Sequence, residues 1–379
     1  MKPGRYVRLI PEGPDDVRRL WETAAPLDDQ SRPDWIDPED DAEYRLVGPA
    51  APCGGTSGEE QLYAAELDLL ESVGFVVDPD SAGPGPHRIF VRRPRADQIW
   101  SIGIYEGESP SRLVPSLRWP NPVLTRQDVA DVPATFVADP FLVLGANECL
   151  MFFEVMNWRT GKGEIGWATS QRFGPWQYQR IVLEQPFHLS YPYVFEWQRD
   201  YYMVPETHQA QAVYLYRAAD FPTGWVRVAT LLDGAYFADA SLFAHEGRWW
   251  MFVDASSDGA HDTLRLFGAE SPLAPWREHP ASPIVAGDAR YARPAGRVVC
   301  RGGRPIRFAQ NCSDDYGVDV RAFEILQLTP TSYAEHPLEG NPILAASGTG
   351  WNARGMHHLD PIELPTGGWL AAVDGWTDL

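Results

Sequence analysis

The feature of this chain that most constrains its fold is a repeated phrase of two strands. In each copy a short turn carrying Asp or Pro leads into an apolar strand, and an aromatic-rich strand follows. The copies begin at residues 136–141, 190–195, 237–243, 292–298 and 357–361. Five β-hairpins spaced by tens of residues are typical of a propeller rather than of a sandwich or an α/β fold. The sequence therefore predicts an all-β, five-bladed β-propeller.

The second strand of each copy is equally recognisable. These partner strands are expected at residues 149–155, 201–206, 249–254, 305–310 and 369–374. Radial repetition points the first strand of every blade at one axis, so residues at the same place in each copy should meet around one central pocket. The first-strand anchors in this alignment are Asp139, Pro192, Asp239, Pro294 and Asp360.

Residues 1–95 do not show the repeat and are expected to form a small α+β elaboration before a propeller at residues 96–379. The expected elements are helices at 15–23 and 59–73 and short strands at 75–78 and 88–92, with a loop over 26–60. The sequence assigns this segment no role. If it supplied strands to the repeat, a sixth blade would be possible.

The overall charge narrows the range of partners. With 32 Lys and Arg against 52 Asp and Glu, the net charge is −20, so nucleic acid and anionic membrane surfaces would be repelled. No apolar run of about 18 residues predicts membrane insertion, and the N-terminus lacks an apolar signal region. We expect a soluble cytoplasmic protein that acts on a small molecule or a glycan.

Motifs for cofactors and metals are missing from the sequence. No dinucleotide-binding glycine motif, P-loop or nucleophile elbow occurs, so no cofactor is expected. None of the four cysteines forms a CxxC pair. Cys300 and Cys312 flank one hairpin and could pair, although reduced thiols are expected. His357 and His358 are adjacent and point to opposite faces of a strand, so no metal site is predicted.

Several phrases resemble one known family. They lie at residues 100–105, 121–125, 136–141, 151–155, 186–195, 292–297, 320–325 and 356–361. The stretch from about residue 99 to 376 resembles the propeller family of the N-terminal domain of glucosamine inositolphosphorylceramide transferases. The resemblance does not imply transferase activity, because in the plant enzymes a separate C-terminal domain transfers the sugar. More distantly, the blade plan resembles five-bladed glycosidases of the arabinanase, xylosidase and invertase type.

The glycosidase resemblance implies carboxylates at the inner ends of successive blades. Glycoside hydrolysis needs two facing carboxyl groups, and a third often tunes them. Asp139 lies where those enzymes place the base or nucleophile, although an Asp-Pro pair can also be a turn cap. Glu206 ends an apolar strand, so burial should raise its pKa and suit a general acid, unless an arginine pairs with it. Asp239 repeats the place of Asp139 and would tune the pair or bind sugar.

Further residues are expected to contact the substrate. They are His188, Tyr191, Arg293, Gln310, Trp351, His358 and Asp360. Arg293 could clamp a carboxylate, a phosphate or a hydroxyl pair, or could neutralise Asp139 or Asp360. Tyr191 and Trp351 could stack on sugar rings. Glu154 and Asp254 repeat the place of Glu206 and could be structural or line the pocket.

These assignments favour a carbohydrate-active enzyme that cleaves a glycosidic bond by glycoside hydrolase-like acid/base catalysis in the central channel. The second copy has Tyr191 where an acid would be expected. That departure favours a first alternative, a propeller enzyme that tailors a small metabolite in a biosynthetic pathway. A second alternative is a module that binds a glycan or glycolipid headgroup without chemistry. Both enzyme hypotheses predict loss of turnover when the acids are neutralised, whereas binding would survive.

Overall fold

In the computed structural model the chain forms two compact units, residues 1–95 and 96–379. The structure describes residues 98–145, 147–256 and 259–378, together with the backbone of four short strands in the first unit. These strands are β1 (Arg5–Arg8), β2 (Tyr44–Val47), β3 (Val76–Val77) and β4 (Arg88–Val91), in the sheet order β1-β2-β4-β3.

Two of these strands, β3 and β4, confirm the expected ones, whereas β2 lies in the segment expected to be loop, so that expectation was wrong. The two expected helices lie outside the described residues. Because β1–β4 pair only with one another in the described part of the chain, they supply no sixth blade.

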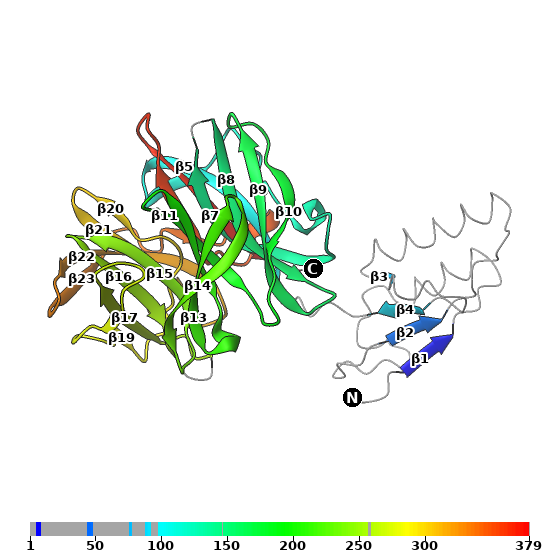
Figure 1. The fold of residues 1–379 in the computed structure, drawn as a ribbon. Helices are drawn as coiled ribbons and strands as arrows, with labels where there is room; N and C mark the ends of the chain where they lie inside the picture. Colours follow the sequence, from blue (N-terminus) through cyan, green and yellow to red (C-terminus); the bar gives the residue numbers. More distant parts are fainter. Residues whose placement is uncertain are drawn as a thin grey trace. The chain divides into compact units, whose positions relative to one another are not determined.

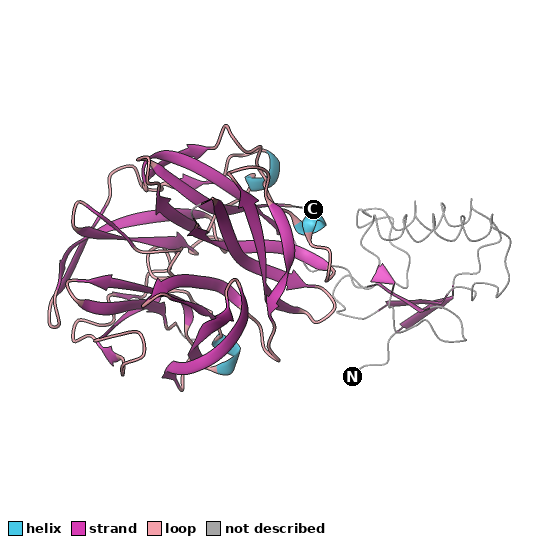
Figure 2. Cartoon of the chain, turned by 45° about the horizontal axis from the view of Figure 1, so that its top comes forward, coloured by secondary structure: helices cyan, strands magenta, loops and turns pink. Residues whose placement is uncertain are grey.

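The second unit is a five-bladed β-propeller, as predicted (Figures 1 and 2). Blade 1 contains β7 (Ala134–Leu144), β8 (Glu148–Asn157), β9 (Lys162–Gln171) and β10 (Gln177–Leu183). Blade 2 contains β11 (Ser190–Trp197), β12 (Asp200–Glu206), β13 (Ala212–Asp220) and β14 (Thr223–Asp233). Blade 3 contains β15 (Ala238–His245), β16 (Arg248–Asp254), β17 (Thr263–Ala269), β18 (Arg277–Glu278) and β19 (Val285–Ala286).

Blade 4 contains β20 (Val299–Arg301), β21 (Arg304–Asn311), β22 (Asp319–Leu328), β23 (Tyr333–Pro337) and β24 (Leu344–Ala345). Blade 5 joins the two ends of the propeller sequence. Its strands are β25 (Leu359–Glu363), β26 (Trp369–Thr377), β5 (Ile99–Ser109) and β6 (Arg112–Pro115). β26 pairs antiparallel with β5 along its whole length, so the first and last segments of the propeller close the ring by backbone hydrogen bonds.

The apolar core lies between adjacent blades, because most central strands are buried on both faces. One cluster, around Ile104, Val137 and Phe153, joins blade 5 to blade 1. Another, around Val204 and Leu242, joins blade 2 to blade 3. Aromatic residues on the second strands fill these layers, which explains why that strand of each copy is aromatic-rich.

A second repeated sequence, Asn-Pro or Ser-Pro, forms hydrogen bonds with the third strand of three blades. Asn121 and Asn341 each precede a cis proline and bond both backbone groups of a third-strand residue. Asn121 bonds Ile104 N and O at 2.8 and 2.9 Å, and Asn341 bonds Ala322 N and O at the same two distances. In blade 3 the place is taken by Ser282, whose hydroxyl accepts one bond from Leu266 N at 3.3 Å.

The first strands differ in their pairing register, which determines which side chains reach the site. In blades 1, 2 and 3 the pairing register shifts at the same place, and Asp139, Tyr191 and Asp239 adopt φ of 53°, 45° and 53°. Such a shift is a β-bulge, which adds one residue to the strand and re-aims a side chain. The first strand of blade 5, β25, pairs with β26 without a shift, and Asp360 lies opposite Ala372.

The unshifted register corrects one anchor of the sequence alignment. Asp360 lies opposite the residue two before Asp374, whereas in blade 1 Phe141 lies opposite the residue two before Glu154. Asp360 therefore takes the place of Phe141, not that of Asp139.

Two further sequence expectations concern the thiols and membrane spans. Cys149, Cys300 and Cys312 are free thiols, so Cys300 and Cys312 are reduced as expected. In the described part of the chain we find no helix that is both apolar and long enough to cross a membrane.

Candidate active site

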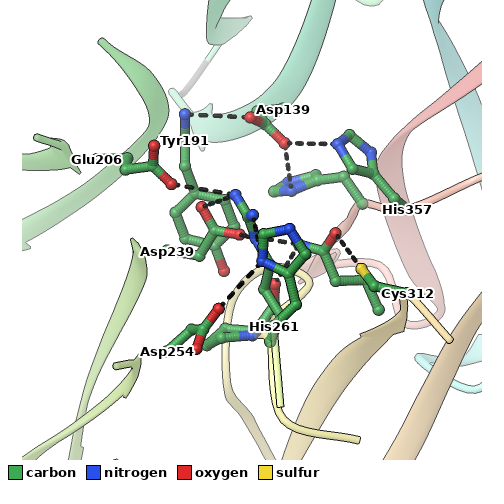
Figure 3. Close-up of polar contacts among 12 residues, drawn as sticks. Asp139, Tyr191, Glu206, Asp239, Asp254, His261, Cys312 and His357 are labelled. Carbon is green, nitrogen blue, oxygen red and sulfur yellow. Dashed lines mark hydrogen bonds and ion pairs between the residues drawn. The ribbon is translucent and has the colours of Figure 1, made fainter. Parts of the chain in front are cut away.

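The second strand of every blade carries a polar side chain at the same place, at or near its end. These five residues are Glu154, Glu206, Asp254, Gln310 and Asp374, all at most 5% exposed. In blades 1–3 they pair with Ala138, Ser190 and Ala238, the residues directly before the bulge. The radial repeat thus supplies four carboxyl groups and one amide, one from each blade. Figure 3 shows two of them, Glu206 and Asp254, together with Asp139 and Asp239.

Asp139 belongs to a chain of two carboxyl groups and one histidine. His357 Nδ1 lies 2.8 Å from Asp374 Oδ1, and His357 Nε2 lies 3.6 Å from Asp139 Oδ1 (Figure 3). Asp374 Oδ2 also accepts the backbone N–H of Asp139 at 2.9 Å. The His357 ring stacks on Trp100 with centroids 4.0 Å apart. These contacts fix Asp139 in its positive-φ conformation and fix the histidine that faces it.

Burial and neighbouring charges set the protonation of this chain. Burial, with the charge of Asp374 adding to it, raises the pKa of Asp139 to about 6, although His357 opposes the rise. Burial alone would lower the pKa of His357, but the charge and hydrogen bond of Asp374 outweigh it and raise the pKa. The raised pKa favours the protonated form of His357, which lies between Asp374 and Asp139.

Arg293 organises a second group of acids. Its Nε donates to Asp239 Oδ2 at 2.6 Å, and one terminal nitrogen donates to Glu206 Oε2 at 3.1 Å. Gln310 Nε2 donates to Asp239 Oδ2 at 2.8 Å. The Tyr316 ring centroid lies 5.2 Å from the guanidinium carbon. The structure thus brings together four predicted site residues, but Arg293 pairs with Asp239 and Glu206, and Asp360 pairs with Arg297 instead.

The expectation of a raised pKa for Glu206 is wrong, and the alternative, an arginine partner, is present. Burial does act to raise the pKa, but the hydrogen bond from His208 and the charge of Arg293 outweigh it, so the pKa of Glu206 is lowered. His208 Nδ1 lies 2.5 Å from Glu206 Oε1. The lowered pKa favours the ionised form of Glu206, which does not suit a general acid.

Glu154, at the same place in blade 1, has the opposite character. Burial and the charges of Asp139, Glu206 and Asp239 raise its pKa well above the usual range. His188 Nδ1 accepts the backbone N–H of Gly163 at 2.9 Å, which places the ring proton on Nε2, 3.4 Å from Glu154 Oε1. Among the described residues Glu154 Oε1 has no hydrogen-bond partner. The predicted contact residue His188 therefore faces this carboxyl group.

Asp254 also faces a histidine without receiving a bond from it. His261 Nδ1 lies 3.4 Å from Asp254 Oδ2 and 3.0 Å from a terminal nitrogen of Arg293 (Figure 3). Arginine is only a donor, so His261 Nδ1 must accept and has no proton to offer Asp254. Asp254 Oδ1 accepts the Ser256 N–H at 2.9 Å, but Oδ2 has no partner among the described residues.

Sequence reasoning missed much of this set. His208, His261, Asp374 and the position of His357 beside Asp139 were not among the predicted site residues. Asp374 ends a partner strand at the same place as Glu206, so the repeat itself could have identified it. His208 and His261 had no such signal, because they lie in loops that differ between blades.

Two predicted contact residues, Tyr191 and His358, lie within the protein core. Tyr191 is 0% exposed, and its hydroxyl bonds Ser241 Oγ at 2.7 Å and Gly296 N at 2.6 Å, so its ring has no free face for a sugar. His358 donates from Nε2 to Pro140 O at 3.0 Å, while burial lowers its pKa to about 3. Its Nδ1 therefore carries no proton and faces Asp139 Oδ1 at 3.5 Å.

Asp360 and Trp351 lie apart from the acids of Figure 3. Asp360 pairs with Arg297 Nε at 2.8 Å and accepts the backbone N–H of Leu142 at 2.6 Å. Trp351 lies in a short 3₁₀ turn and packs so closely on Gly103 that a β-carbon there would lie 2.7 Å from the ring. These contacts give both residues a structural role.

Asp139, His357 and Asp374 are also the residues most suited to a metal ion. Their donor atoms all lie within 4.8 Å of one another. One imidazole and two carboxylates would suit a divalent cation, which would have to replace the hydrogen bond of His357 to Asp374.

The family model described as glucosamine inositolphosphorylceramide transferase 1, N-terminal, matches residues 93–376. The chain belongs to this family. Glucosamine inositolphosphorylceramide transferase 1 of Oryza sativa subsp. japonica is 37% identical over 302 residues, which cover 74% of this chain and 40% of the relative. The protein of the same name from Arabidopsis thaliana is 34% identical over 298 residues, covering 73% and 39%.

The chain spans about two fifths of the length of these curated relatives. Among solved structures, the catalytic domain of a Coprinopsis cinerea GH62 α-L-arabinofuranosidase is similar with a TM-score of 0.48 and 13% identity, over 73% of this chain and 97% of that domain. An endo-1,4-β-xylanase from Bacteroides thetaiotaomicron gives a TM-score of 0.47 and 14% identity, over 62% and 82%.

Proposed function

We propose that this protein is a carbohydrate-active enzyme whose central acids act on a glycosidic bond of a glycan or glycolipid headgroup. The names of the curated relatives, which contain a sugar and a glycolipid, support this class of substrate. The names also say transferase. The proposal therefore concerns only the glycosidic bond that is broken, and experiment must identify the acceptor of the sugar.

The observation that carries the proposal is the environment of Asp139. A carboxyl group with a pKa of about 6 is near the ideal for a general base at neutral pH. His357 and Asp374 hold it in place, and the unprotonated Nδ1 of His358 lies 3.5 Å away, where it can accept a hydrogen bond from Asp139 once Asp139 is protonated. Asp139 is the base or nucleophile of the proposal.

The proton donor of the proposal is Glu154 instead of Glu206. Glu154 has a raised pKa and a bond-free oxygen, whereas Glu206 and Asp239 are held by Arg293. Glu206, whose pKa is lowered, then supplies negative charge near the reacting carbon, which stabilises the oxocarbenium character of a glycosidic transition state.

The proposal is tested with Asp139→Asn and Glu154→Gln on a panel of aryl glycosides and oligosaccharides. Each substitution should lower kcat by about 10²- to 10⁴-fold, the range for general acid or base catalysis. Asp262→Asn, which removes one carboxylate outside the group around Asp139 and Arg293, is the matched control and should keep kcat. Unchanged turnover in both test variants would contradict the assignment.

One observation favours a second candidate, a sugar-binding module without chemistry. Arg293 ties up two of the three acids predicted to be catalytic, at 2.6 and 3.1 Å. In that case the wild-type protein should bind a sugar in calorimetry, show no turnover, and keep its affinity in Asp139→Asn.

A further inference from the structure

The second-strand acids of blades 1–3 each face a histidine that lies outside the strands. The pairs are Glu154 with His188, Glu206 with His208, and Asp254 with His261. His208 already bonds its acid, and His261 accepts from Arg293 and has no proton to offer. His188 differs from both, because its Nε2 lies 3.4 Å from Glu154 Oε1, just beyond the usual N–H···O limit of about 3.2 Å. It therefore holds a proton close to an acid that it does not yet bond.

The backbone fixes the tautomer of His188. Its Nδ1 accepts the N–H of Gly163 at 2.9 Å, and a backbone N–H can only donate, so the proton of the neutral ring stays on Nε2. Burial lowers the pKa of His188, which favours this neutral ring. The backbone N–H of His188 donates to Gln209 Oε1 at 2.9 Å. These bonds keep the Nε2–H directed at Glu154.

Gly163 brings strand β9 against both members of the pair. A β-carbon at Gly163 would lie 2.8 Å from His188 Cε1 and 2.6 Å from Glu154 Oε1, closer than such atoms approach without displacement. Glu154 Oε1 is buried and has no hydrogen-bond partner among the described residues. The nearby donor for this oxygen is therefore the imidazole, and the tight fit of β9 limits how far that imidazole can turn away.

Proton donation by Glu154 creates a charge that its neighbours oppose. In the proposed reaction the proton of Glu154 goes to the leaving oxygen, which keeps the electron pair of the broken bond, and Glu154 is left as a carboxylate. The groups that disfavour this carboxylate are Asp139, Glu206, Asp239 and Asp374. A hydrogen bond that tightens only as Glu154 becomes charged stabilises the transition state more than the ground state, which is what accelerates a reaction.

We infer that His188 is a positioning residue for Glu154, with its Nε2–H held ready to bond the carboxylate that forms when Glu154 gives up its proton. The inference rests on the proposed function, since it takes Glu154 as the proton donor. It replaces the expected role of His188 as a direct contact of the substrate.

The first test measures the pKa of Glu154 in the full chain without any substrate. Infrared difference spectroscopy during a pH titration follows the C=O stretch of protonated carboxyl groups, and the band missing from Glu154→Gln belongs to Glu154. His188→Asn keeps an acceptor for the Gly163 N–H but has no donor that reaches Glu154. Because that donor favours the ionised form, its loss should raise the pKa of Glu154 by about 1 to 2.

Two further variants sharpen this measurement. His188→Gln places an amide N–H near the position of Nε2 and should bring the pKa back toward the wild-type value. His336→Asn, at an exposed histidine of β23, is the matched control and should leave the pKa of Glu154 unchanged. If circular dichroism shows that His188→Asn does not fold, His188→Phe, which fills the same space without a donor, takes its place.

The second test is a double-mutant cycle on kcat with the glycoside panel. His188→Asn should lower kcat about 10- to 100-fold in the wild-type chain, as expected for a hydrogen bond to a charged group. The same change should have no further effect in Glu154→Gln, because a residue that acts only through Glu154 has nothing left to act on. A purely structural role would lower kcat equally in both backgrounds.

The outcomes separate the inference from the proposed function. Identical titration of the Glu154 band in wild type and His188→Asn would overturn the inference, whether or not the protein turns over a glycoside. Equal losses of kcat in the two backgrounds would overturn it as well. A raised pKa in His188→Asn together with full turnover in Glu154→Gln would keep the contact between the two side chains and contradict the proposed function.

Discussion

Blades 1–3 and blades 4–5 build the central site in different ways. Each first strand of blades 1–3 contains a bulge at Asp139, Tyr191 or Asp239, and each second strand carries an acid opposite the residue before the bulge. The first strand of blade 5 has no bulge, and blades 4 and 5 present Arg293 and His358 opposite Gln310 and Asp374. Blades 1–3 therefore supply most of the acids, whereas blade 4 supplies the guanidinium that holds Asp239 and Glu206, and blade 5 supplies the imidazole that faces Asp139.

The difference shows that a repeated fold need not give a symmetric site. A bulge re-aims one side chain without changing the pairing on either side of it. Its presence in three blades places two acids where the other blades place a cation and a neutral ring. Each prediction below removes one part of this asymmetry.

The largest effect is expected from removing the cation of blade 4. Arg293→Met leaves Asp239 and Glu206 buried without their partner, so the free energy of unfolding should fall by about 3–5 kcal/mol. Urea denaturation followed by circular dichroism measures this change. Arg293→Lys, which keeps the charge but not the fork of donors, should lose less. Equal stability of wild type and Arg293→Met would show that the acids of blades 1–3 do not need blade 4.

A smaller loss is expected at the ion pair between Asp360 of blade 5 and Arg297. Asp360→Asn removes the charge facing Arg297, whose side chain is 18% exposed and can reach water, so the loss should be about 2 kcal/mol. The pH profile of turnover should not change, because Asp360 lies apart from Asp139. A shifted profile would place Asp360 back among the acids that act on the substrate.

The pH dependence of turnover tests the link between blade 5 and blade 1. Asp139 acts as a base when ionised, so kcat should fall as the pH drops through about 6. His357 lowers the pKa of Asp139, so His357→Gln should move this limb to higher pH. The loss of a charged hydrogen bond should also reduce kcat about tenfold. A reduced kcat with an unmoved limb would make His357 a packing residue only.

The smallest effects are expected at the Asn-Pro and Ser-Pro sequences that form hydrogen bonds with the third strands of blades 4 and 3. Asn341→Ala removes two bonds to Ala322 and should lower the free energy of unfolding by about 1–2 kcal/mol. Ser282→Ala removes one longer bond to Leu266 and should lower it by about 0.5 kcal/mol. Thermal unfolding of the two variants, side by side, measures the ranking. A reversed order would contradict the different roles of these phrases in blades 4 and 3.

The sequence by itself determined the number of blades, most of the first and second strands, and the meeting of Glu206, Asp239, Arg293 and Gln310. In blade 4 the first strand is β20, directly after the expected residues 292–298, and Pro294 forms only an isolated bridge. The sequence could determine the rest because radial repetition turns equal places in the sequence into neighbours in space. The closing of the ring by β5 and β26 follows the same logic, since the first strand after residue 98 had no partner of its own copy.

Only the tertiary structure decided which of these acids has a raised pKa and which first-strand residues occupy equivalent places in different blades. Asp139-Pro140 and Asp360-Pro361 read alike, but a bulge is a property of the pairing between strands, and it occurs in blade 1 and not in blade 5. The pKa of Glu206 depends on Arg293, 87 residues away, and on His208 in a loop peculiar to blade 2. Local sequence fixes strands and turns, whereas charge and register depend on groups that only the closed ring brings together.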